Sequence, residues 1–352
     1  MAQENKLNCL RVRQSLKIND VMKEKWDYLI ILDACRYDYF ASLYKEFFHG
    51  ELEKRISTGS STPEWCLRQF KGYYPDVIYI SGNPFINSKV EMRGFDAKKH
   101  FYEVIDVWDF GWSEELGTVP PENINRTVLD LISRFPRKRL IIHYLQPHVP
   151  YISPKFKTSV KAPVITDWRN RALLTTAKTN RLNRYLNASV NTLGNLLVRA
   201  KLLGCVDEIR ELLGLPPATH NDAVRRKYGI SGLREAYREN LRIALAHAAN
   251  LCDRLISYRP SSQIVITSDH GELLGENGKF GHRAKSKDPY LLEIPWLRVK
   301  SVKRKVSDEE TRLPIRFTKL AAESYKKKLK EKIKRLKIRK KLMIHMPTKL
   351  LE

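Results

Sequence analysis

Short runs of apolar residues recur along the chain, and a cluster of polar residues follows each of them. Four runs predict buried strands, at residues 28–32 (YLIIL), 77–80 (VIYI), 140–143 (LIIH) and 264–267 (IVIT). Helical patterns, including those at 123–135 and 233–257, separate the strands. Strands that alternate with helices favour an α/β fold, with a mostly parallel central sheet and helices on both faces. In such sheets ligands bind beyond the carboxyl ends of the strands, where the polar clusters fall.

The hydrophobic pattern divides the chain into a main domain with three additions. We predict an N-terminal arm at 1–25, the main domain at 26–300 and a basic tail at 301–352. Residues 155–232 read as basic and helical without a strand, so we expect a helical insertion that caps the strand ends. No run approaches the roughly 20 apolar residues of a membrane-spanning helix, and the N-terminus lacks the apolar run of a signal peptide.

Charge changes this picture at the C-terminal end. The 352 residues include 64 Lys or Arg and 39 Asp or Glu, which gives a net charge of +25. Residues 326–341 (KKKLKEKIKRLKIRKK) contain eleven Lys or Arg and one Glu, so they supply +10 of that charge. We expect a basic amphipathic helix that docks on an anionic membrane surface; a solvated helix and nucleic-acid binding stay open as alternatives.

The cysteines indicate the compartment. Five cysteines at scattered positions fit neither a disulfide framework nor a zinc knuckle. We therefore expect a protein of the reducing cytoplasm, peripheral at the membrane if the basic segment docks there.

Two of the strand-end clusters carry residues that bind metals. Asp269 and His270 follow one predicted strand directly, and Asp33 follows another. A carboxylate and an imidazole suit Zn²⁺ or Mn²⁺. The alternative for Asp33 is a helix N-cap, and Asp-His-Gly alone is often an ordinary turn.

Hydroxyl groups gather in the segment 57–65 (STGSSTPEW). Because proline is favoured at the first helical position, Pro63 predicts a helix with Thr62 as its N-cap and Ser61 just outside it. The helix dipole and free N–H groups would stabilise an oxyanion there, although a Ser/Thr-rich loop is the simpler interpretation. A further imidazole, His148, lies in a proline-rich segment (QPHVPY) that otherwise reads as a surface turn.

Taken in order, the segments LDACR, SSTPEW, QPHVPY and SDHGELLGENG…GH resemble the alkaline phosphatase superfamily, specifically its sulfatase-like branch. That branch includes arylsulfatases, phosphonate monoester hydrolases, phosphoglycerol transferases and lipid A phosphoethanolamine transferases. The resemblance spans roughly residues 26–299 and implies an alkaline-phosphatase-like fold, with the main domain as the catalytic one.

The resemblance also implies roles for individual residues. It makes Ser61, two residues before Pro63, the covalent nucleophile, and Thr62 a less suitable one because its offset from the proline differs. It implies metal ligation by Asp33, Ser61, Asp269 and His270, substrate contacts and proton transfer by His148 and His282, and an oxyanion contact by Lys279. The expected cofactor is one divalent metal, Zn²⁺ or Mn²⁺, with a second ion left open.

The predicted function is a metal-dependent hydrolase or transferase of phosphate monoesters or diesters, acting on an anionic ester substrate through a covalent Ser61 intermediate. Sulfatase activity is the first alternative. Related sulfatases use a formylglycine made from Cys or Ser in the pattern x-Pro-x-Arg, and Trp65 stands where that arginine is required. An inactive polyanion-binding or nucleic-acid-binding protein on the same fold is the alternative of another class.

Overall fold

The structure is a computed structural model that describes residues 16–156, 163–173 and 219–303, with a few isolated residues between and beyond these ranges. Most of the predicted N-terminal arm, the middle of the predicted insertion and most of the basic segment 326–341 lie outside the described residues. No described helix combines the length and the apolar character needed to cross a membrane.

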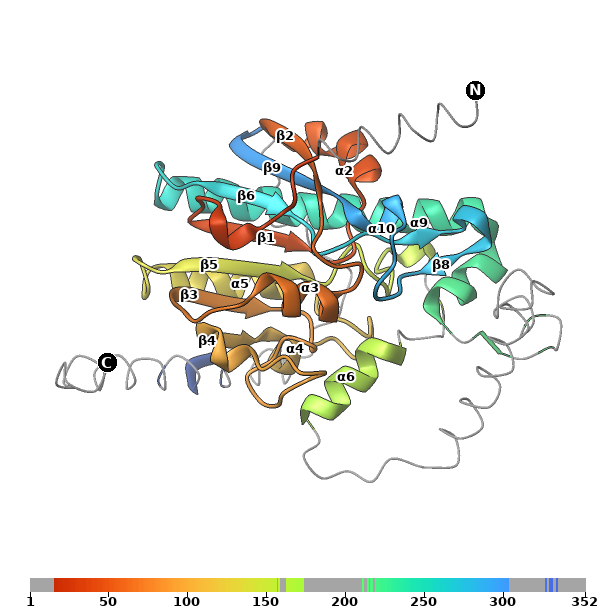
Figure 1. Cartoon of the computed structure of the whole chain (residues 1–352), viewed down its shortest axis with the longest axis horizontal. Helices are drawn as coiled ribbons and strands as arrows, with labels where there is room; N and C mark the ends of the chain where they lie inside the picture. Colours follow the sequence, from red (N-terminus) through yellow and green to blue (C-terminus); the bar gives the residue numbers. More distant parts are fainter. Residues whose placement is uncertain are drawn as a thin grey trace.

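A seven-stranded sheet forms the centre of the molecule, with the strand order β2-β9-β6-β1-β5-β3-β4 (Figure 1). Strand β9 pairs antiparallel with β2 and β6, and the pairs from β6 to β4 are parallel. A separate two-stranded hairpin joins β7 and β8. The strands are β1 (Tyr28–Leu32), β2 (Phe48–Ile56), β3 (Tyr74–Ser81), β4 (Phe101–Asp106), β5 (Arg139–Tyr144), β6 (Ile264–Thr267), β7 (Leu273–Leu274), β8 (Phe280–Gly281) and β9 (Glu293–Val302).

Helices connect most of these strands. The α-helices are α2 (Tyr37–Leu43), α3 (Thr62–Gln69), α4 (Val107–Phe110), α5 (Pro121–Ile132), α6 (Pro163–Leu173), α9 (His220–Tyr258) and α10 (Pro289–Leu292). Single 3₁₀ turns occur at η1 (Val21–Lys23), η2 (Tyr44–Glu46), η3 (Ala97–Lys99), η4 (Pro154–Phe156) and η5 (Glu276–Gly278).

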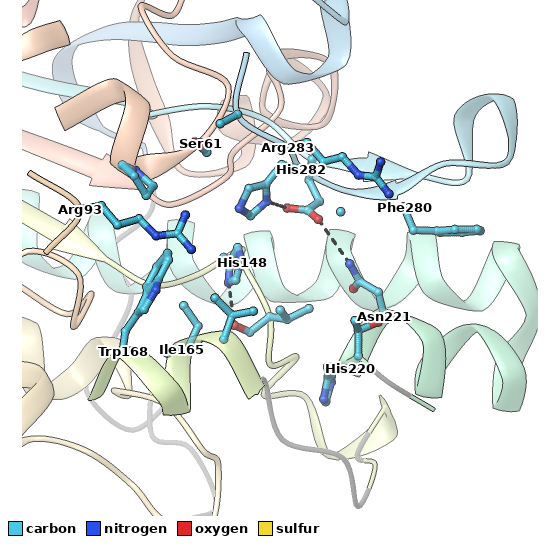
Figure 2. A pocket seen from close by; sticks show the side chains of 17 residues that line it. Ser61, Arg93, His148, Ile165, Trp168, His220, Asn221, Phe280, His282 and Arg283 are labelled. Atoms are coloured by element: carbon cyan, nitrogen blue, oxygen red, sulfur yellow. Dashed lines mark hydrogen bonds and ion pairs between the residues drawn. The ribbon is translucent and has the colours of Figure 1, made fainter. Parts of the chain in front are cut away.

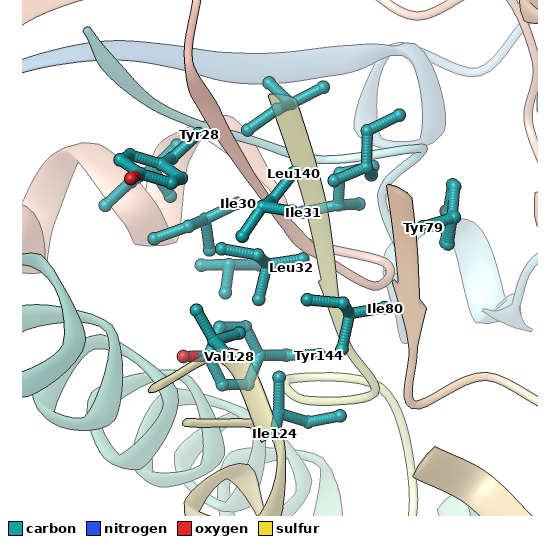
Figure 3. Close-up of a cluster of buried hydrophobic side chains, with 14 of the residues drawn as sticks. Tyr28, Ile30, Ile31, Leu32, Tyr79, Ile80, Ile124, Val128, Leu140 and Tyr144 are labelled. Atoms are coloured by element: carbon teal, nitrogen blue, oxygen red, sulfur yellow. The ribbon is translucent and has the colours of Figure 1, made fainter. Parts of the chain in front are cut away.

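Helices cover both faces of the sheet, because successive residues of each strand point to opposite sides. On one face Trp65 of α3 packs edge-on against His143 of β5, with ring centroids 6.4 Å apart. On the other face Tyr144 donates a hydrogen bond to Asn125 of α5, and the Asn125 amide donates to the His247 carbonyl of α9 at 2.8 Å. Figure 3 shows part of the apolar core beneath α5. The predicted α/β fold class is confirmed.

The four predicted strands are present as β1, β3, β5 and β6, while β2, β4 and β9 were not predicted. The main domain also begins earlier than the predicted residue 26. Val21 is fully buried, and Ile18 forms a bridge with Ile56 at the end of β2. The last turns of the predicted arm therefore belong to the main domain.

Four adjacent strands end at one edge of the sheet and bring polar residues together there. Asp33 directly follows β1, Asp269 lies two residues after β6, and Asn83 lies two residues after β3. His143 is the second-last residue of β5, which lies between β1 and β3. The parallel arrangement thus gathers residues more than 200 positions apart into one cluster.

Gly271 fixes the loop after β6 by a close backbone approach. Its N–H donates to the Leu291 carbonyl at 2.9 Å. A Cβ atom at position 271 would lie 2.0 Å from the Tyr290 carbonyl oxygen. The glycine is required here because no side chain fits between the loop and α10.

We expect Gly271→Ala to lower the free energy of unfolding by about 1–3 kcal/mol, since the methyl group forces two backbone segments apart. Urea unfolding measures the change. Gly72→Ala is the matched control, because nothing lies within 4 Å of its added Cβ and its backbone is not left-handed. Equal stability of the two variants would show that the loop has room for a side chain.

Candidate functional site

Two buried carboxylates form the base of the site. Asp33 and Asp269 are 1% and 0% exposed. One oxygen of Asp269, Oδ1, accepts hydrogen bonds from the backbone N–H groups of Ala34 at 3.0 Å and His270 at 2.9 Å. The Asn83 side-chain amide donates to Asp33 Oδ2 at 2.6 Å. Since Asp33 precedes Arg36, the N-cap of α2, the alternative of Asp33 as a helix cap is not supported.

Two histidines face these carboxylates. The Nδ1 atom of His270 donates to the Gly271 carbonyl at 2.8 Å, which leaves its Nε2 as an acceptor 3.3 Å from Asp269 Oδ2 and 3.9 Å from Asp33 Oδ1. The Nε2 atom of His143 is buried, 3.5 Å from Asp33 Oδ2, and has no hydrogen-bond partner among the described residues. Its Nδ1 lies 2.7 Å from the Tyr79 hydroxyl.

The surroundings shift the pKa values of this cluster. Burial raises the pKa of Asp33, but the close approach of His143 and the charges of His148, His143 and His270 outweigh burial and hold this pKa well below its usual range. Burial lowers the pKa of His270 more than the neighbouring carboxylates raise it. The surroundings therefore favour an ionised Asp33 beside a neutral His270 imidazole, which are the protonation states that metal ligands need.

The donor set fits a divalent metal ion. Single ligand atoms of Asp33, His143 and Asp269 lie within 4.8 Å of one another. The described ion-pair partners of the two carboxylates are histidines, with no lysine or arginine among them. Two buried negative charges without a strong cation are costly, and oxygen and imidazole donors suit Zn²⁺ or Mn²⁺.

The hydroxyl that faces this cluster belongs to Thr62. Its Oγ1 donates to Asp269 Oδ2 at 2.8 Å and lies 3.3 Å from His270 Nε2. The Ser61 Oγ atom is buried and has no hydrogen-bond partner among the described residues. Helix α3 begins at Thr62 with Ser61 as its N-cap, one residue earlier than predicted. The geometry thus brings the Thr62 hydroxyl to the cluster, and the role predicted for Ser61 stays a prediction.

A second group of potential ligands lies beside the first. Single ligand atoms of His148, Glu272 and His282 also lie within 4.8 Å of one another. Glu272 Oε2 accepts from His282 Nδ1 at 2.8 Å, and Glu272 Oε1 accepts from the Asn221 amide at 3.3 Å (Figure 2). The His282 ring lies 4.3 Å from the ring of His270, so the two groups are continuous.

Glu272 and His282 shift each other's pKa. Burial lowers the pKa of His282, but the charge of Glu272 and the hydrogen bond to it outweigh burial and raise this pKa. Burial raises the pKa of Glu272, and the charge of His282 with the same hydrogen bond more than reverses that effect. The pair therefore favours a carboxylate beside an imidazolium.

A cavity of about 450 Å³ opens onto the second group, whose three residues His148, Glu272 and His282 all line it. Ser61, His148, Glu272 and His282 line one part of it, and Ile165 and Trp168 of α6 line another. His220 and Asn221 at the start of α9 line the cavity as well. Residues from both ends of the predicted insertion, in α6 and in α9, therefore contribute to its lining. Most of the predicted insertion lies outside the described residues, so its role as a cap over the strand ends stays a prediction.

The predicted site residues largely come together. Asp33 and Asp269 belong to the first group and His270 faces both of them, while His148 and His282 belong to the second group. Lys279 is exposed and does not line the cavity, so its predicted oxyanion contact is not supported.

The sequence interpretation assigned no role to four residues that the structure adds. These residues are Asn83, His143, Asn221 and Glu272. Position relative to the predicted strands could have indicated three of them: Asn83 follows a strand, His143 ends one, and Glu272 follows Asp-His-Gly.

No family model and no curated protein sequence matches the chain. Solved structures that are similar to it include the C-terminal periplasmic domain of a phosphoethanolamine transferase from Campylobacter jejuni, at 14% identity and a TM-score of 0.41, over 80% of this chain and 82% of that one. A phosphonate monoester hydrolase from Agrobacterium radiobacter matches at 12% identity and a TM-score of 0.43, over 78% and 68%. A lipoteichoic acid synthase from Listeria monocytogenes matches at 12% and 0.38, over 82% and 70%.

We expect Asp33→Asn to raise the melting temperature of the metal-free protein by about 3 °C, because it removes one of two buried like charges. The same change should abolish the stabilisation that Zn²⁺ or Mn²⁺ gives the unaltered protein. Thermal melts with a chelator and with each metal measure both effects.

Asp130→Asn is the control, since Asp130 is an exposed carboxylate on α5. If Asp33→Asn retains the full metal-induced rise in melting temperature, Asp33 is not a ligand.

Proposed function

We propose that the protein is a metal-dependent phosphoester hydrolase or transferase whose covalent intermediate forms on Thr62. The observation that carries the proposal is the Thr62 hydroxyl, which donates to the buried Asp269 carboxylate and faces His270 Nε2. A hydroxyl at the start of a helix, surrounded by donors suited to a divalent ion, is the arrangement of an activated nucleophile. This proposal transfers the role predicted for Ser61 to its neighbour.

The chain's own groups prepare the attack. Asp33, Asp269 and His270 would hold the ion, with His143 as a fourth donor. A bound divalent ion would supply positive charge that favours a deprotonated hydroxyl and shields phosphoryl oxygens. Asp269 Oδ2 orients the Thr62 hydroxyl and is placed to receive its proton as the bond from Oγ1 to phosphorus forms. The N-terminus of α3 adds partial positive charge beside the phosphoryl group.

The second group supplies the proton for the leaving group. The His282 Nδ1 atom is held by Glu272, which leaves Nε2 free to donate as the bond from phosphorus to the leaving oxygen breaks. His148 keeps its Nδ1 on the Val149 carbonyl at 2.8 Å, so its Nε2 is free for a phosphoryl oxygen. We assign proton donation to His282 because the Glu272 carboxylate favours its cationic form.

The intermediate is then cleared by a second in-line attack. Water or an acceptor alcohol gives its proton to the now neutral His282 and attacks phosphorus, the bond to Thr62 Oγ1 breaks, and the hydroxyl regains its proton from Asp269. A phosphorylated threonine can be released in this way, whereas a sulfated one has no internal route of elimination. Trp65 in place of the arginine required for formylglycine supports phosphate over sulfate.

We expect a slow phosphoester to trap phosphate on Thr62. Peptide mapping by mass spectrometry locates the modification to Ser61 or Thr62. Thr62→Ala should abolish the trapped species and lower turnover by about 10³-fold or more, because the nucleophile is lost. Ser61→Ala is the matched control and should keep the trapped species. Phosphate on Ser61, with Thr62→Ala still active, would restore the nucleophile predicted from the sequence.

We also expect aryl phosphates or aryl phosphodiesters to be turned over well above aryl sulfates when Mn²⁺ or Zn²⁺ is present. A panel of chromogenic phosphomonoesters, phosphodiesters, phosphonate esters and sulfate esters measures this order. Faster turnover of sulfates would favour the sulfatase alternative. No turnover of any ester, together with no metal-induced stabilisation, would favour a protein that binds polyanions without chemistry.

A further inference from the structure

One side of the cavity has a chemical character that the reacting groups do not need. Trp168 and Ile165 of α6 form an apolar wall there, and the Trp168 ring packs against the tilted ring of Phe85, with ring centroids 5.2 Å apart. Arg93 completes this side of the cavity. Figure 2 shows its guanidinium beside Trp168 and extended toward His148. We call Arg93, Ile165 and Trp168 the distal subsite.

Arg93 is a cation available to a ligand. Its side chain is exposed and forms no ion pair with a carboxylate among the described residues. The carboxylates near it in sequence, Glu91 and Asp96, are paired instead with Lys99. Within the cavity lining the described carboxylate is Glu272, whose oxygens are taken by His282 and Asn221. The guanidinium is therefore not neutralised from inside the cavity.

Arg93 also occupies an unfavourable backbone position. Met92 and Phe95 exchange two backbone hydrogen bonds of 3.0 Å around a two-residue turn. The central residues, Arg93 and Gly94, have φ angles of +49° and +85°. Such turns favour Asn, Asp or Gly at the first central position, since other side chains are strained at positive φ. The buried side chains of Met92 and Phe95 anchor this turn. Because an arginine at this position is strained, its presence indicates that the guanidinium itself has a role.

We propose that the distal subsite binds the part of the substrate beyond the reacting phosphoryl group, and that this part carries an apolar or aromatic moiety with a second anionic group. The apolar moiety packs on Trp168 and Ile165, and the anion pairs with Arg93. The inference rests on the proposed function, because that function places the phosphoryl group at Thr62. It narrows the substrate class to extended esters with two negative centres.

The test measures binding without turnover. Three probes are titrated by calorimetry into the Thr62→Ala protein with Mn²⁺: phenyl phosphate, 4-carboxyphenyl phosphate and the longer 4-(2-carboxyethyl)phenyl phosphate. We expect at least one carboxylated probe to bind about tenfold tighter than phenyl phosphate, as a charge-assisted hydrogen bond allows. Arg93→Asn should reduce this preference to less than twofold and leave the affinity for phenyl phosphate unchanged within about twofold.

The choice of variant separates recognition from folding. Asparagine is favoured at the turn position, so Arg93→Asn should melt at the same temperature as the unaltered protein or higher. Lys98→Asn removes an exposed cation outside the cavity and should keep the full preference. Trp168→Leu should lower the affinity for all three probes, because each probe carries the aromatic ring that packs on Trp168.

An undiminished preference in Arg93→Asn, or no preference in the unaltered pocket, overturns the inference. The proposed function fails separately, through the absence of a phosphorylated Thr62. The protein could show the Arg93-dependent preference and still form no phosphoenzyme. That result would support the distal subsite and contradict the proposed function.

Discussion

The site depends on the burial of two carboxylates, Asp33 and Asp269, side by side at the ends of neighbouring strands. Ionised carboxylates in a protein interior need hydrogen bonds and opposite charge. The chain supplies the hydrogen bonds from Asn83 and from the backbone N–H groups of Ala34 and His270. Among the described residues, the ion-pair partners of these carboxylates are all histidines. A divalent ion would supply the positive charge that the two carboxylates still need.

The backbone next to the carboxylates adopts a strained conformation that places a hydrogen-bond donor beside Asp269. Ala34 adopts a positive φ of 58°, which is unfavourable for alanine and directs its N–H to Asp269. Its carbonyl accepts from the Tyr237 hydroxyl of α9 at 2.7 Å, so the strained residue is held from both sides. Strain of this kind persists where the surroundings determine the conformation, as they do at functional sites.

A buried arginine connects the strand-end loops. Arg36, two residues beyond Ala34, pairs with Asp38 and with Glu276 at 2.7 Å each. The same guanidinium donates to the Glu272 carbonyl at 3.3 Å. The loop after β1 and the segment that carries Glu272 are thereby fixed relative to each other. This contact explains how two groups of ligands from distant parts of the sequence keep one geometry.

The central strands could be predicted because they are buried on both faces and read as unbroken apolar runs. Strand β2 (FHGELEKRI) is an edge strand with many charged residues, and β9 (EIPWLRVKSV) contains a proline and ends among basic residues, so neither forms such a run. Asp33, Asp269 and His270 could be predicted as strand-end residues. The contact between the Thr62 hydroxyl and Asp269 could not be predicted, because the start of a helix is uncertain by one residue and each residue turns the side chain by about 100°.

The central claim is that the buried carboxylates hold a metal ion against the Thr62 hydroxyl. An anomalous difference map, from crystals of the protein grown with Zn²⁺ or Mn²⁺, tests it most directly. The account predicts a peak within about 2–2.5 Å of oxygen or nitrogen atoms of Asp33, Asp269 and His270, with Thr62 Oγ1 as the nearest hydroxyl. A peak found only elsewhere on the protein, or one approached by Ser61 Oγ instead, would contradict it.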